Sequence, residues 1–264
     1  MLKNDIILFM KKLYTAFCFF GLLLCLLTGC TSTKQTFNYV VHAAGGLDGF
    51  EYLNCQEAFL KYVENGQTYI EIDFAFTRDN QVVCTHTFSE HMSEFSLENR
   101  PTLEEFENYL LEGKYHGMTY AWLLEQLKTN QDVCIIFDTK EEDSMDLLSQ
   151  MVKIANEQNF DINSRFIIQV YSTENYEELQ ENFSFKKYWF SNYKSNYSFS
   201  FIKSYFENKQ DVETIVIFQT KWQDLHESGI DLGKKIAVHT VNNPSEIKFF
   251  ANNGVDYIFV DYIN

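Results

Sequence analysis

The stretch YIEIDFAFTRDNQVVCTH, residues 69–86, predicts a strand, a tight turn and a second extended run that ends in a histidine. Because side chains alternate between the faces of a strand, Glu71 and Asp73 point the same way. Two neighbouring carboxylates on a half-buried strand raise each other's pKa unless a cation lies between them. A divalent metal with oxygen ligands is one explanation of this pair, and a solvated strand face is the other.

Apolar runs of strand length recur on both sides of this stretch and alternate with helical patterns. Continuous apolar strands between helices are typical of a parallel sheet that helices cover. The sequence therefore predicts an α/β fold, a (β/α)₈ TIM-type barrel, provided that the run ending at His86 is an excursion and not a ninth barrel strand. An open doubly wound sheet is the alternative, but the chain has no glycine-rich phosphate loop. One expected strand is the part of residues 69–86 that precedes the turn at Asp79-Asn80, and the others cover residues 39–44, 133–139, 166–171, 188–191, 214–219, 235–240 and 256–261.

Helical patterns fill the intervals between these strands. In the irregular region after residue 88, a helix is expected over residues 102–111, with Thr102 as its N-cap and Glu105 as the capping-box partner. A second helix in this region is expected over 119–128. The other expected helices cover residues 56–64, 143–157, 175–181, 197–207, 222–227 and 244–251.

The first thirty residues differ in kind from the rest. Two lysines precede an apolar run over residues 13–27, which is too short to span a bilayer comfortably, and the run ends in Leu-Thr-Gly-Cys30. This ending resembles a bacterial lipobox, in which the cysteine is lipidated. We expect a lipoprotein signal peptide over residues 1–29, a tether over 30–37 lipidated at Cys30, and a barrel domain over 38–264. A plain transmembrane anchor is the alternative.

The net charge of the chain limits the kinds of partner that it is expected to bind. The 264 residues carry a formal net charge of −16. So acidic a chain is not expected to bind nucleic acid, whose affinity depends on Lys and Arg neutralising phosphates, or to adhere electrostatically to anionic lipid. A lipid anchor would instead hold it hydrophobically. The expected location is therefore outside the cytoplasm, on a bacterial membrane at the cell surface or its periplasmic side.

Polar side chains follow several of the apolar runs at the point where each expected strand ends. In a barrel, catalytic groups gather at the C-terminal ends of the strands, so these side chains are expected to share one rim. The ionisable residues in these positions are His42, Glu71, Asp73, Asp138, Lys140, His239 and Asp261.

A set of short motifs occurs in order between residue 38 and the end of the chain. The motifs are His42-Ala-Ala-Gly-Gly, Ile70-Glu-Ile-Asp, Thr77-Arg-Asp, Val82-Val-Cys-Thr-His, Phe137-Asp-Thr-Lys, His239-Thr-Val-Asn and Gly254-Val-Asp. Any one of them is weak, but the ordered set resembles the glycerophosphodiester phosphodiesterase family. It looks like a divergent branch of the barrels related to phosphatidylinositol phospholipase C. The resemblance implies hydrolysis of glycerophosphodiesters or related polyol phosphodiesters.

The resemblance also implies roles for individual residues. Glu71, Asp73 and Asp138 would hold a divalent metal, Ca²⁺ or Mg²⁺. His42 and His86 would act as general acid and base, which suits groups that titrate near neutral pH. A bound metal and a lysine side chain would neutralise the charge of an anionic phosphodiester. Lys140 would hold a phosphate oxygen. His239 would form a wall of the site.

The chain departs from the family pattern at several positions, one of which is Asn80, where glycine is expected after Asp79. The arginine after the first histidine is Ala43, the second histidine is followed by Thr87 and not by aspartate, and Asp138 stands where glutamate is usual. A bidentate phosphate contact is therefore missing. Two alternatives stay open: an enzyme like phosphatidylinositol-specific phospholipase C that cleaves intact lipid, and a non-catalytic surface lipoprotein that binds phosphodiesters.

Overall fold

The computed structural model describes residues 37–139, 144–193, 195 and 197–263. Two predicted functional residues, Cys30 and Lys140, lie outside the described residues, as does the predicted signal peptide. None of the helices in the described part of the chain is long and apolar enough to cross a membrane.

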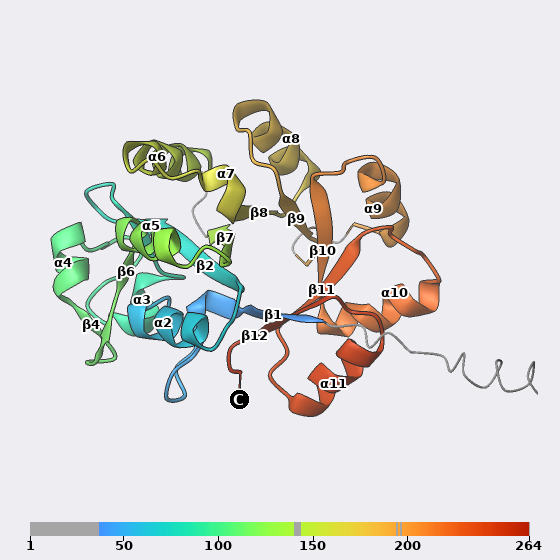
Figure 1. Ribbon diagram of the computed structural model, residues 1–264, viewed down its shortest axis with the longest axis horizontal. Coiled ribbons are helices and arrows are strands. Elements are labelled where there is room, and N and C mark those ends of the chain that lie inside the picture. The colour runs from blue at the N-terminus through green and yellow to red at the C-terminus, as the bar shows by residue number, and fades with distance from the viewer. Residues whose placement is uncertain (1–36, 140–143, 194, 196, 264) are drawn as a thin grey trace, which may run out of the picture. The chain divides into compact units, whose positions relative to one another are not determined.

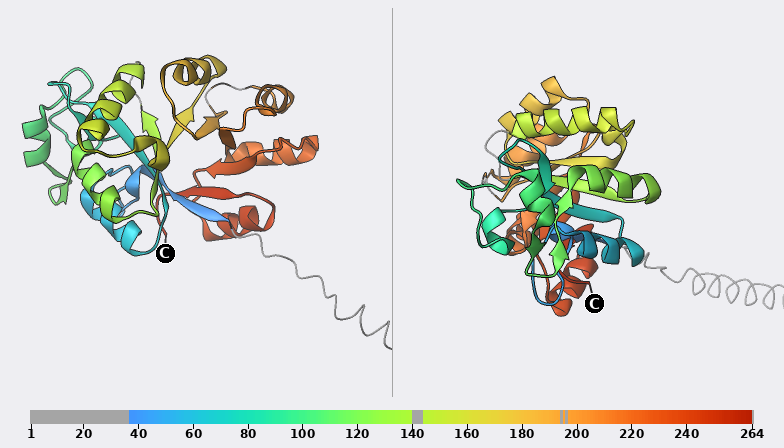
Figure 2. Two further views of the ribbon diagram at one scale, coloured as in Figure 1. Left: turned by 45° about the horizontal axis from the view of Figure 1, so that its top comes forward. Right: turned by 90° about the vertical axis from the view of Figure 1, so that its left-hand side faces the viewer.

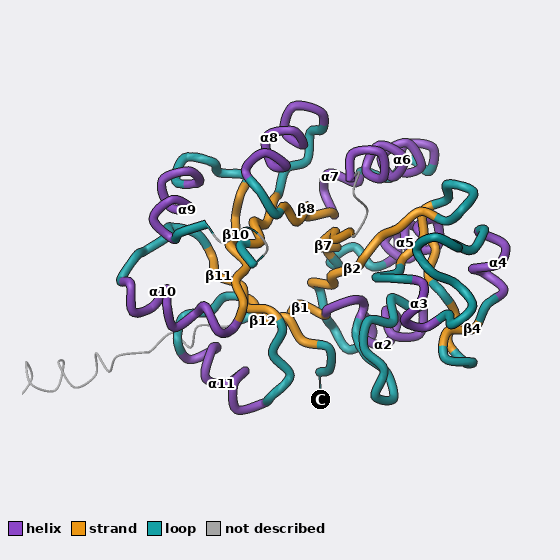
Figure 3. The backbone as a smooth tube through the Cα atoms, turned by 180° about the vertical axis from the view of Figure 1, so that it is seen from behind, coloured by secondary structure: helices purple, strands orange, loops and turns teal. Residues whose placement is uncertain are grey.

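In the described residues, eight parallel strands form a closed barrel, which confirms the predicted fold class. Each strand pairs with its neighbour in chain order, and β1 pairs with both β12 and β2, so that the sheet closes. Figure 3 shows these strands as a ring with helices around it. The strands are β1 (Asn38–Val41), β2 (Tyr69–Phe76), β7 (Cys134–Thr139), β8 (Phe166–Val170), β9 (Tyr188–Ser191), β10 (Val212–Phe218), β11 (Lys235–His239) and β12 (Tyr257–Val260).

Helices on the outside of the barrel connect most of these strands (Figure 1). Their starts follow from local chemistry: the Thr119, Ser172 and Ser198 side chains accept hydrogen bonds from backbone N–H groups of the first turns of α5, α8 and α9. The principal helices are α2 (Gln56–Glu64), α5 (Tyr120–Thr129), α6 (Ser144–Glu157), α8 (Thr173–Asn182), α9 (Phe199–Phe206), α10 (Trp222–Ser228) and α11 (Pro244–Asn252). Shorter pieces are η1 (His42–Ala44), α7 (Ile162–Arg165) and η2 (Gln219–Lys221).

The run that ends at His86 is an excursion from the barrel, as the strand count requires. It forms β3 (Val82–Cys84), which pairs antiparallel with the end of β2. The chain then builds α3 (Phe88–His91), α4 (Leu103–Asn108), β4 (Leu110–Leu111), β5 (Tyr115–His116) and β6 (Met118–Thr119), and β6 pairs with β3. This insertion lies on the side of the barrel opposite α9, α10 and α11 (Figures 1 and 2).

The helix predicted over residues 102–111 is too long. The capping box of Thr102 and Glu105 is present, but the helix ends at Asn108. Leu110 and Leu111 instead form a two-stranded ladder with β5, and Leu111 is buried in the small core of the insertion. Tertiary pairing therefore overrides the helical pattern of the last three residues.

The core has two main parts, which follow the alternation of the strands. Side chains on the outer face, such as Ile70, Ile72 and Phe74 on β2, pack against the helices. Side chains on the inner face fill the barrel, as Val40, Trp189 and others do. Successive residues of one strand thus belong to different clusters, which is the pattern expected of a filled barrel. The inner cluster of the barrel comprises Val40, Ile136, Ile167, Trp189, Val216, Ala237, Tyr257 and Phe259.

Candidate active site

The candidate site lies just above the apolar residues that fill the barrel. On each strand, its residue is the next inward-facing one toward the C-terminal rim. Since side chains alternate with period two, the residue two positions after an inner apolar residue also faces inward. Each inner row therefore ends in a side chain at the rim, and most of these side chains are polar. The pairs of inner residue and rim residue are Val40 and His42, Ile136 and Asp138, Ile167 and Gln169, Ala237 and His239, and Phe259 and Asp261.

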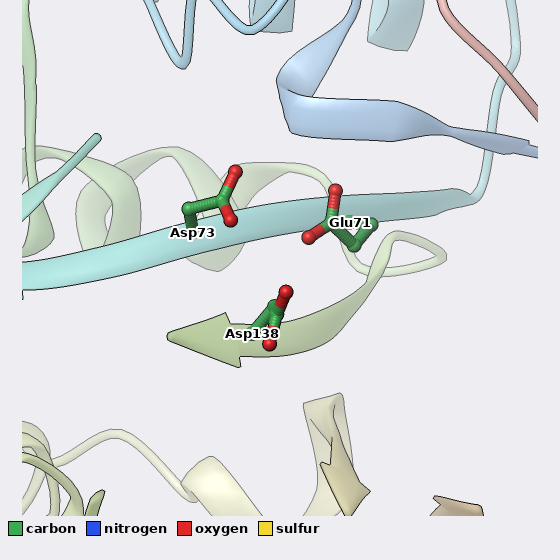
Figure 4. A group of neighbouring side chains, drawn as sticks. All are labelled: Glu71, Asp73 and Asp138. Atoms are coloured by element: carbon green, nitrogen blue, oxygen red, sulfur yellow. The ribbon is translucent and has the colours of Figure 1, made fainter. Parts of the chain in front are cut away.

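Three buried carboxylates meet at this rim. Glu71 and Asp73 come from β2 and Asp138 from β7, and an oxygen atom of each lies within 4.8 Å of the others. Figure 4 shows the two side chains of β2 above that of β7. The register of the strands places Asp73 directly beside Asp138. The solvated-face interpretation of the first two carboxylates is therefore wrong, because Glu71 is 2% and Asp73 1% exposed.

The electrostatics of this cluster fit a hard cation. Burial and the charge of Asp73 raise the pKa of Glu71 to about 8, so the cluster without a metal retains a proton at neutral pH. Three convergent carboxylates present only oxygen donors, which Ca²⁺ and Mg²⁺ prefer. Asp73 is also held in position, because the Asn54 amide donates to Asp73 Oδ2 over 3.1 Å and accepts from the Asp73 N–H. A divalent cation would replace the retained proton.

His42 is locked in place at the end of β1. Its Nδ1 lies 2.7 Å from Asp261 Oδ1, and its Nε2 lies 3.9 Å from Glu71 Oε2. The Asn242 amide donates to the other oxygen of Asp261. The residue after the histidine, Ala43, is in the left-handed region at φ 48°, and its N–H donates to Glu71 Oε2 over 2.6 Å. The first histidine is thus coupled both to a carboxylate of its own and to the acidic cluster.

The charge on His42 follows from these contacts. Burial by itself lowers the pKa of an imidazole. The hydrogen bond to Asp261, the charge of Asp261 and the net negative charge that the acidic cluster keeps with one proton bound together outweigh burial and raise the pKa of His42 to about 9. The ring is therefore an imidazolium at neutral pH in the absence of a metal, and it can donate a proton from Nε2.

His86 has a different environment. It follows β3 in the insertion, and its Nδ1 lies 2.7 Å from Glu90 Oε1 on the one-turn helix α3. The ring of Tyr52 lies between the two predicted catalytic histidines, with its centroid 4.9 Å from that of His86 and 4.8 Å from that of His42. The insertion therefore brings the second histidine to the same rim as the first.

A third histidine, His239, lies against His42. Its Nε2 lies 3.3 Å from His42 Nε2, and its ring stacks on Tyr193 at 5.6 Å and 14°. The hydroxyl of Tyr193 donates to the hydroxyl of Tyr171 over 3.1 Å, and Tyr171 donates to Asp138 Oδ1. A chain of contacts thus links His239 to the acidic cluster.

The structure brings together most of the residues predicted for the site: His42, Glu71, Asp73, Asp138 and His239, with His86 next to them across Tyr52. Two further roles were not predicted. The rim position of Asp261 follows from its strand, but its contact with His42 depends on β1 lying beside β12. Tyr52 lies in an irregular loop at φ 55°, where no periodic pattern indicates which way a side chain points.

Comparisons with known proteins agree with this geometry. The model of the glycerophosphoryl diester phosphodiesterase family matches residues 50–264. No curated protein matches the chain by sequence. Among solved structures, a glycerophosphodiester phosphodiesterase from Parabacteroides distasonis has a TM-score of 0.67 at 17% identity, covering 86% of this chain and 93% of that one.

Two other solved structures are similar. A glycerophosphodiester phosphodiesterase from Thermotoga maritima has a TM-score of 0.61 at 20% identity, covering 86% of this chain and 95% of that one. A phosphodiesterase from Oleispira antarctica, in complex with the product sn-glycerol-3-phosphate, has a TM-score of 0.65 at 15% identity, covering 85% and 93%. At such identities the structures support the fold, whereas the family model covers most of the sequence. The chain therefore belongs to the glycerophosphoryl diester phosphodiesterase family and is a phosphoric diester hydrolase.

Proposed function

We propose that this chain hydrolyses glycerophosphodiesters or related polyol phosphodiesters with the help of a divalent cation, Ca²⁺ or Mg²⁺. The observation that carries the proposal is the buried cluster of Glu71, Asp73 and Asp138, which lies beside a histidine paired with a carboxylate. These three carboxylates would hold the cation. When bound, the cation would neutralise negative charge that develops on the phosphate oxygens.

His42 is proposed as the general acid. Asp261 accepts the hydrogen bond from Nδ1–H, so the proton on Nε2 is the one that faces the site. Transfer of that proton to the departing alkoxide oxygen avoids release of a strongly basic leaving group. The hydrogen bond to Asp261 favours the protonated ring, which would keep this proton in place until the bond to phosphorus breaks.

His86 is proposed as the general base. Glu90 accepts from Nδ1–H, which leaves Nε2 as the basic nitrogen of the ring. This nitrogen would take the proton from the nucleophile, either water or a neighbouring hydroxyl of the substrate. Tyr52, which touches both rings, would keep the acid and the base in one site.

Phosphate binding must differ from the family pattern. The arginine position is Ala43, which is fully buried, so its side chain cannot reach a substrate. Lys140 is proposed as the phosphate contact, and His239 as a wall that packs against the substrate. Together with the cation, these groups would offset the charge of the phosphodiester.

The test is an assay of the chain beginning at residue 31, with Ca²⁺ or Mg²⁺ and then with a chelator. We expect glycerophosphodiester cleavage that the chelator abolishes and that Asp138→Asn lowers strongly. Asp132→Asn is the matched control, because it changes an exposed aspartate at the opposite end of the same strand. A folded protein that releases no alcohol with either cation would refute the enzymatic proposal.

Two other outcomes would support the alternatives. Full activity of a metal-free preparation on intact phosphatidylinositol favours the phospholipase C-like reaction. Stable binding of a glycerophosphodiester without turnover favours a non-catalytic surface lipoprotein.

Export and anchoring are proposed from the sequence of residues 1–37. Signal-peptide cleavage before Cys30 and lipidation of that residue would place the barrel outside the cytoplasm on a membrane. We expect Cys30→Ala to yield unlipidated protein that no longer sediments with membranes. Unchanged membrane partitioning of this variant would contradict the lipobox.

A further inference from the structure

A pocket of about 290 Å³ beside the active site has no role in the reaction described above. It lies between the segment that follows β9 and the end of β10 with the start of α10. Its walls include the side chains of Tyr193, Tyr197, Phe199, Ile217 and Phe218. We propose that this pocket binds an acyl chain carried by the glycerol of the substrate, an inference that rests on the proposed function.

The pocket adjoins the active site, and the two share Tyr193 as a wall residue. Tyr193 lines the pocket, while its ring stacks on His239 and its hydroxyl donates to Tyr171. Phe218 lies 4.9 Å from Tyr193 and 6.4 Å from His239, measured between ring centroids. Tyr193 and Phe218 thus border both the pocket and His239, so a substrate group that extends past them would reach the pocket.

Most polar groups of the pocket walls bond to other protein atoms, as the Ser198 hydroxyl does by accepting from the Phe201 N–H. The Tyr193 hydroxyl faces Tyr171, and the Tyr197 hydroxyl is 3.4 Å from Glu174 Oε2. The Asn192 side chain donates to the Tyr197 carbonyl and accepts from the Tyr197 N–H, over 3.0 Å in each case. The two tyrosines consequently present ring carbons to the pocket, and the asparagine amide is occupied with the backbone.

The two charged residues of the pocket form a pair with each other. Lys221 Nζ lies 3.2 Å from Asp224 Oδ2, and both side chains are more than half exposed. The pair adds no net charge, so the pocket is not built for a second phosphate or for an ammonium head group. Phe218, at 41% exposure, is a large apolar side chain left open to water. Burial of such a surface by a hydrocarbon is favourable, which favours an acyl chain as the occupant.

The size of the pocket sets a limit on what it accepts. A volume of 290 Å³ is near the lower end of about 300–1,000 Å³ for small-molecule pockets. A short chain, or the first part of a longer one, is therefore expected to fill it. Beyond that length, further methylene groups would remain in water and add nothing.

A chain-length series tests this limit on the full-length protein in lipid nanodiscs. The substrates are glycerophosphoethanolamine and its 1-butyryl, 1-hexanoyl and 1-octanoyl derivatives, each below its micellar concentration. We expect kcat/KM to rise by about fourfold for each buried CH₂ and then to level off. Cleavage of the deacylated compound with no rise along the series would overturn the acyl pocket and leave the proposed function standing.

Phe218→Ala tests whether this pocket, and not another surface, causes the rise. We expect it to lower the ratio of kcat/KM for the octanoyl substrate to kcat/KM for the deacylated substrate by roughly tenfold. Phe218→Leu should give an intermediate ratio. The matched control is Phe249→Ala, which removes another exposed phenylalanine, on α11, and should leave the ratio as it was. Equal ratios in the Phe218→Ala and Phe249→Ala variants would overturn the assignment.

Equilibrium dialysis separates this inference from a failure of the proposed function. If no substrate of the series is cleaved, the proposed function fails, but the pocket can still be tested by binding of 1-octanoyl-glycerophosphoethanolamine. Tighter binding to the Phe249→Ala variant than to the Phe218→Ala variant would support the pocket. Identical binding by the two variants would overturn it.

Discussion

The two halves of the active site hold their histidines in different ways. His42 stands at the end of a barrel strand, is 6% exposed, and is fixed by Asp261 from the neighbouring strand β12. His86 stands on the insertion, its side chain is 22% exposed, and its carboxylate partner Glu90 lies only four residues further along the chain. The barrel half thus depends on long-range strand pairing, and the insertion half on a local contact.

This difference bears on what each half contributes. A buried hydrogen bond to a carboxylate is strong and is costly to break, whereas a partly exposed pair is weakened by water and salt. The barrel half can therefore hold a proton at a fixed position. The insertion half is suited to the proposed general base, whose position has to adjust to the nucleophile, and Tyr52 is in contact with both rings.

Removal of each histidine is expected to have the largest effect. Proposed general acid–base groups contribute about 10²–10⁴-fold in rate, and we expect His42→Ala to approach the upper end because the residue is tied to the acidic cluster. His86→Ala should fall nearer the lower end. The measurement is kcat/KM with saturating metal, and full activity of His42→Ala would refute its role.

Loss of the negative charge of Asp261, the partner of His42 in the barrel half, is expected to have the next largest effect on activity. Asp261→Asn retains the shape of the side chain but removes the charge that raises the pKa of His42, so we expect a loss of roughly 10²-fold. The pH profile distinguishes this role from a merely structural one. Because His42 must be protonated to act as an acid, the basic limb of the profile should move to lower pH in the variant. An unchanged limb would show that Asp261 does not act through the histidine.

The corresponding change in the insertion half is expected to be small. Glu90→Gln removes a partly exposed partner of His86, and such contacts are worth about 0.2–1 kcal/mol, or up to about fivefold in rate. Glu90→Gln and Asp261→Asn can be compared under the same assay, since each replaces a carboxylate with an amide. A loss in Glu90→Gln as large as that in Asp261→Asn would remove the distinction between the two halves.

The last expected effect concerns the stability of the metal-free protein, whose Tm should depend on pH. The pKa of Glu71 is about 8 in the folded protein against an ordinary 4.5, so its contribution is complete below pH 4.5 and is lost as the pH rises through 8. The pKa of His42 is about 9 against 6.5, so its contribution is complete below pH 6.5 and is lost through pH 9.

Glu71 therefore predicts that Tm in chelator falls between pH 4.5 and pH 8, and His42 predicts a fall between pH 6.5 and pH 9. The decline should be steepest between pH 6.5 and pH 8, where both groups contribute. Added Ca²⁺ should raise Tm most at the alkaline end, where Glu71 no longer has to lose a proton to bind it. Glu71→Gln should flatten the decline in chelator. A Tm that instead rises over this interval would contradict the protonation states assigned to the barrel half.

The sequence pattern predicts some features of this chain correctly and others incorrectly. The alternation of apolar strands and helices predicts the barrel, and the spacing of Glu71 and Asp73 predicts a shared face, because both signals are local and periodic. The same local pattern predicts too long a helix after Thr102, because it carries no information about the pairing of Leu111 with Tyr115.

Sequence alone thus determined the fold class, the family resemblance and the carboxylate pair, all of which depend on residues near one another along the chain. Only the tertiary structure decided which groups act together. The β2–β7 register places Asp138 beside Asp73, the β1–β12 pairing gives His42 its carboxylate, and a loop without periodicity brings Tyr52 between two histidines. The physical reason is that barrel closure joins residues as much as 219 positions apart, and no local pattern encodes such a contact.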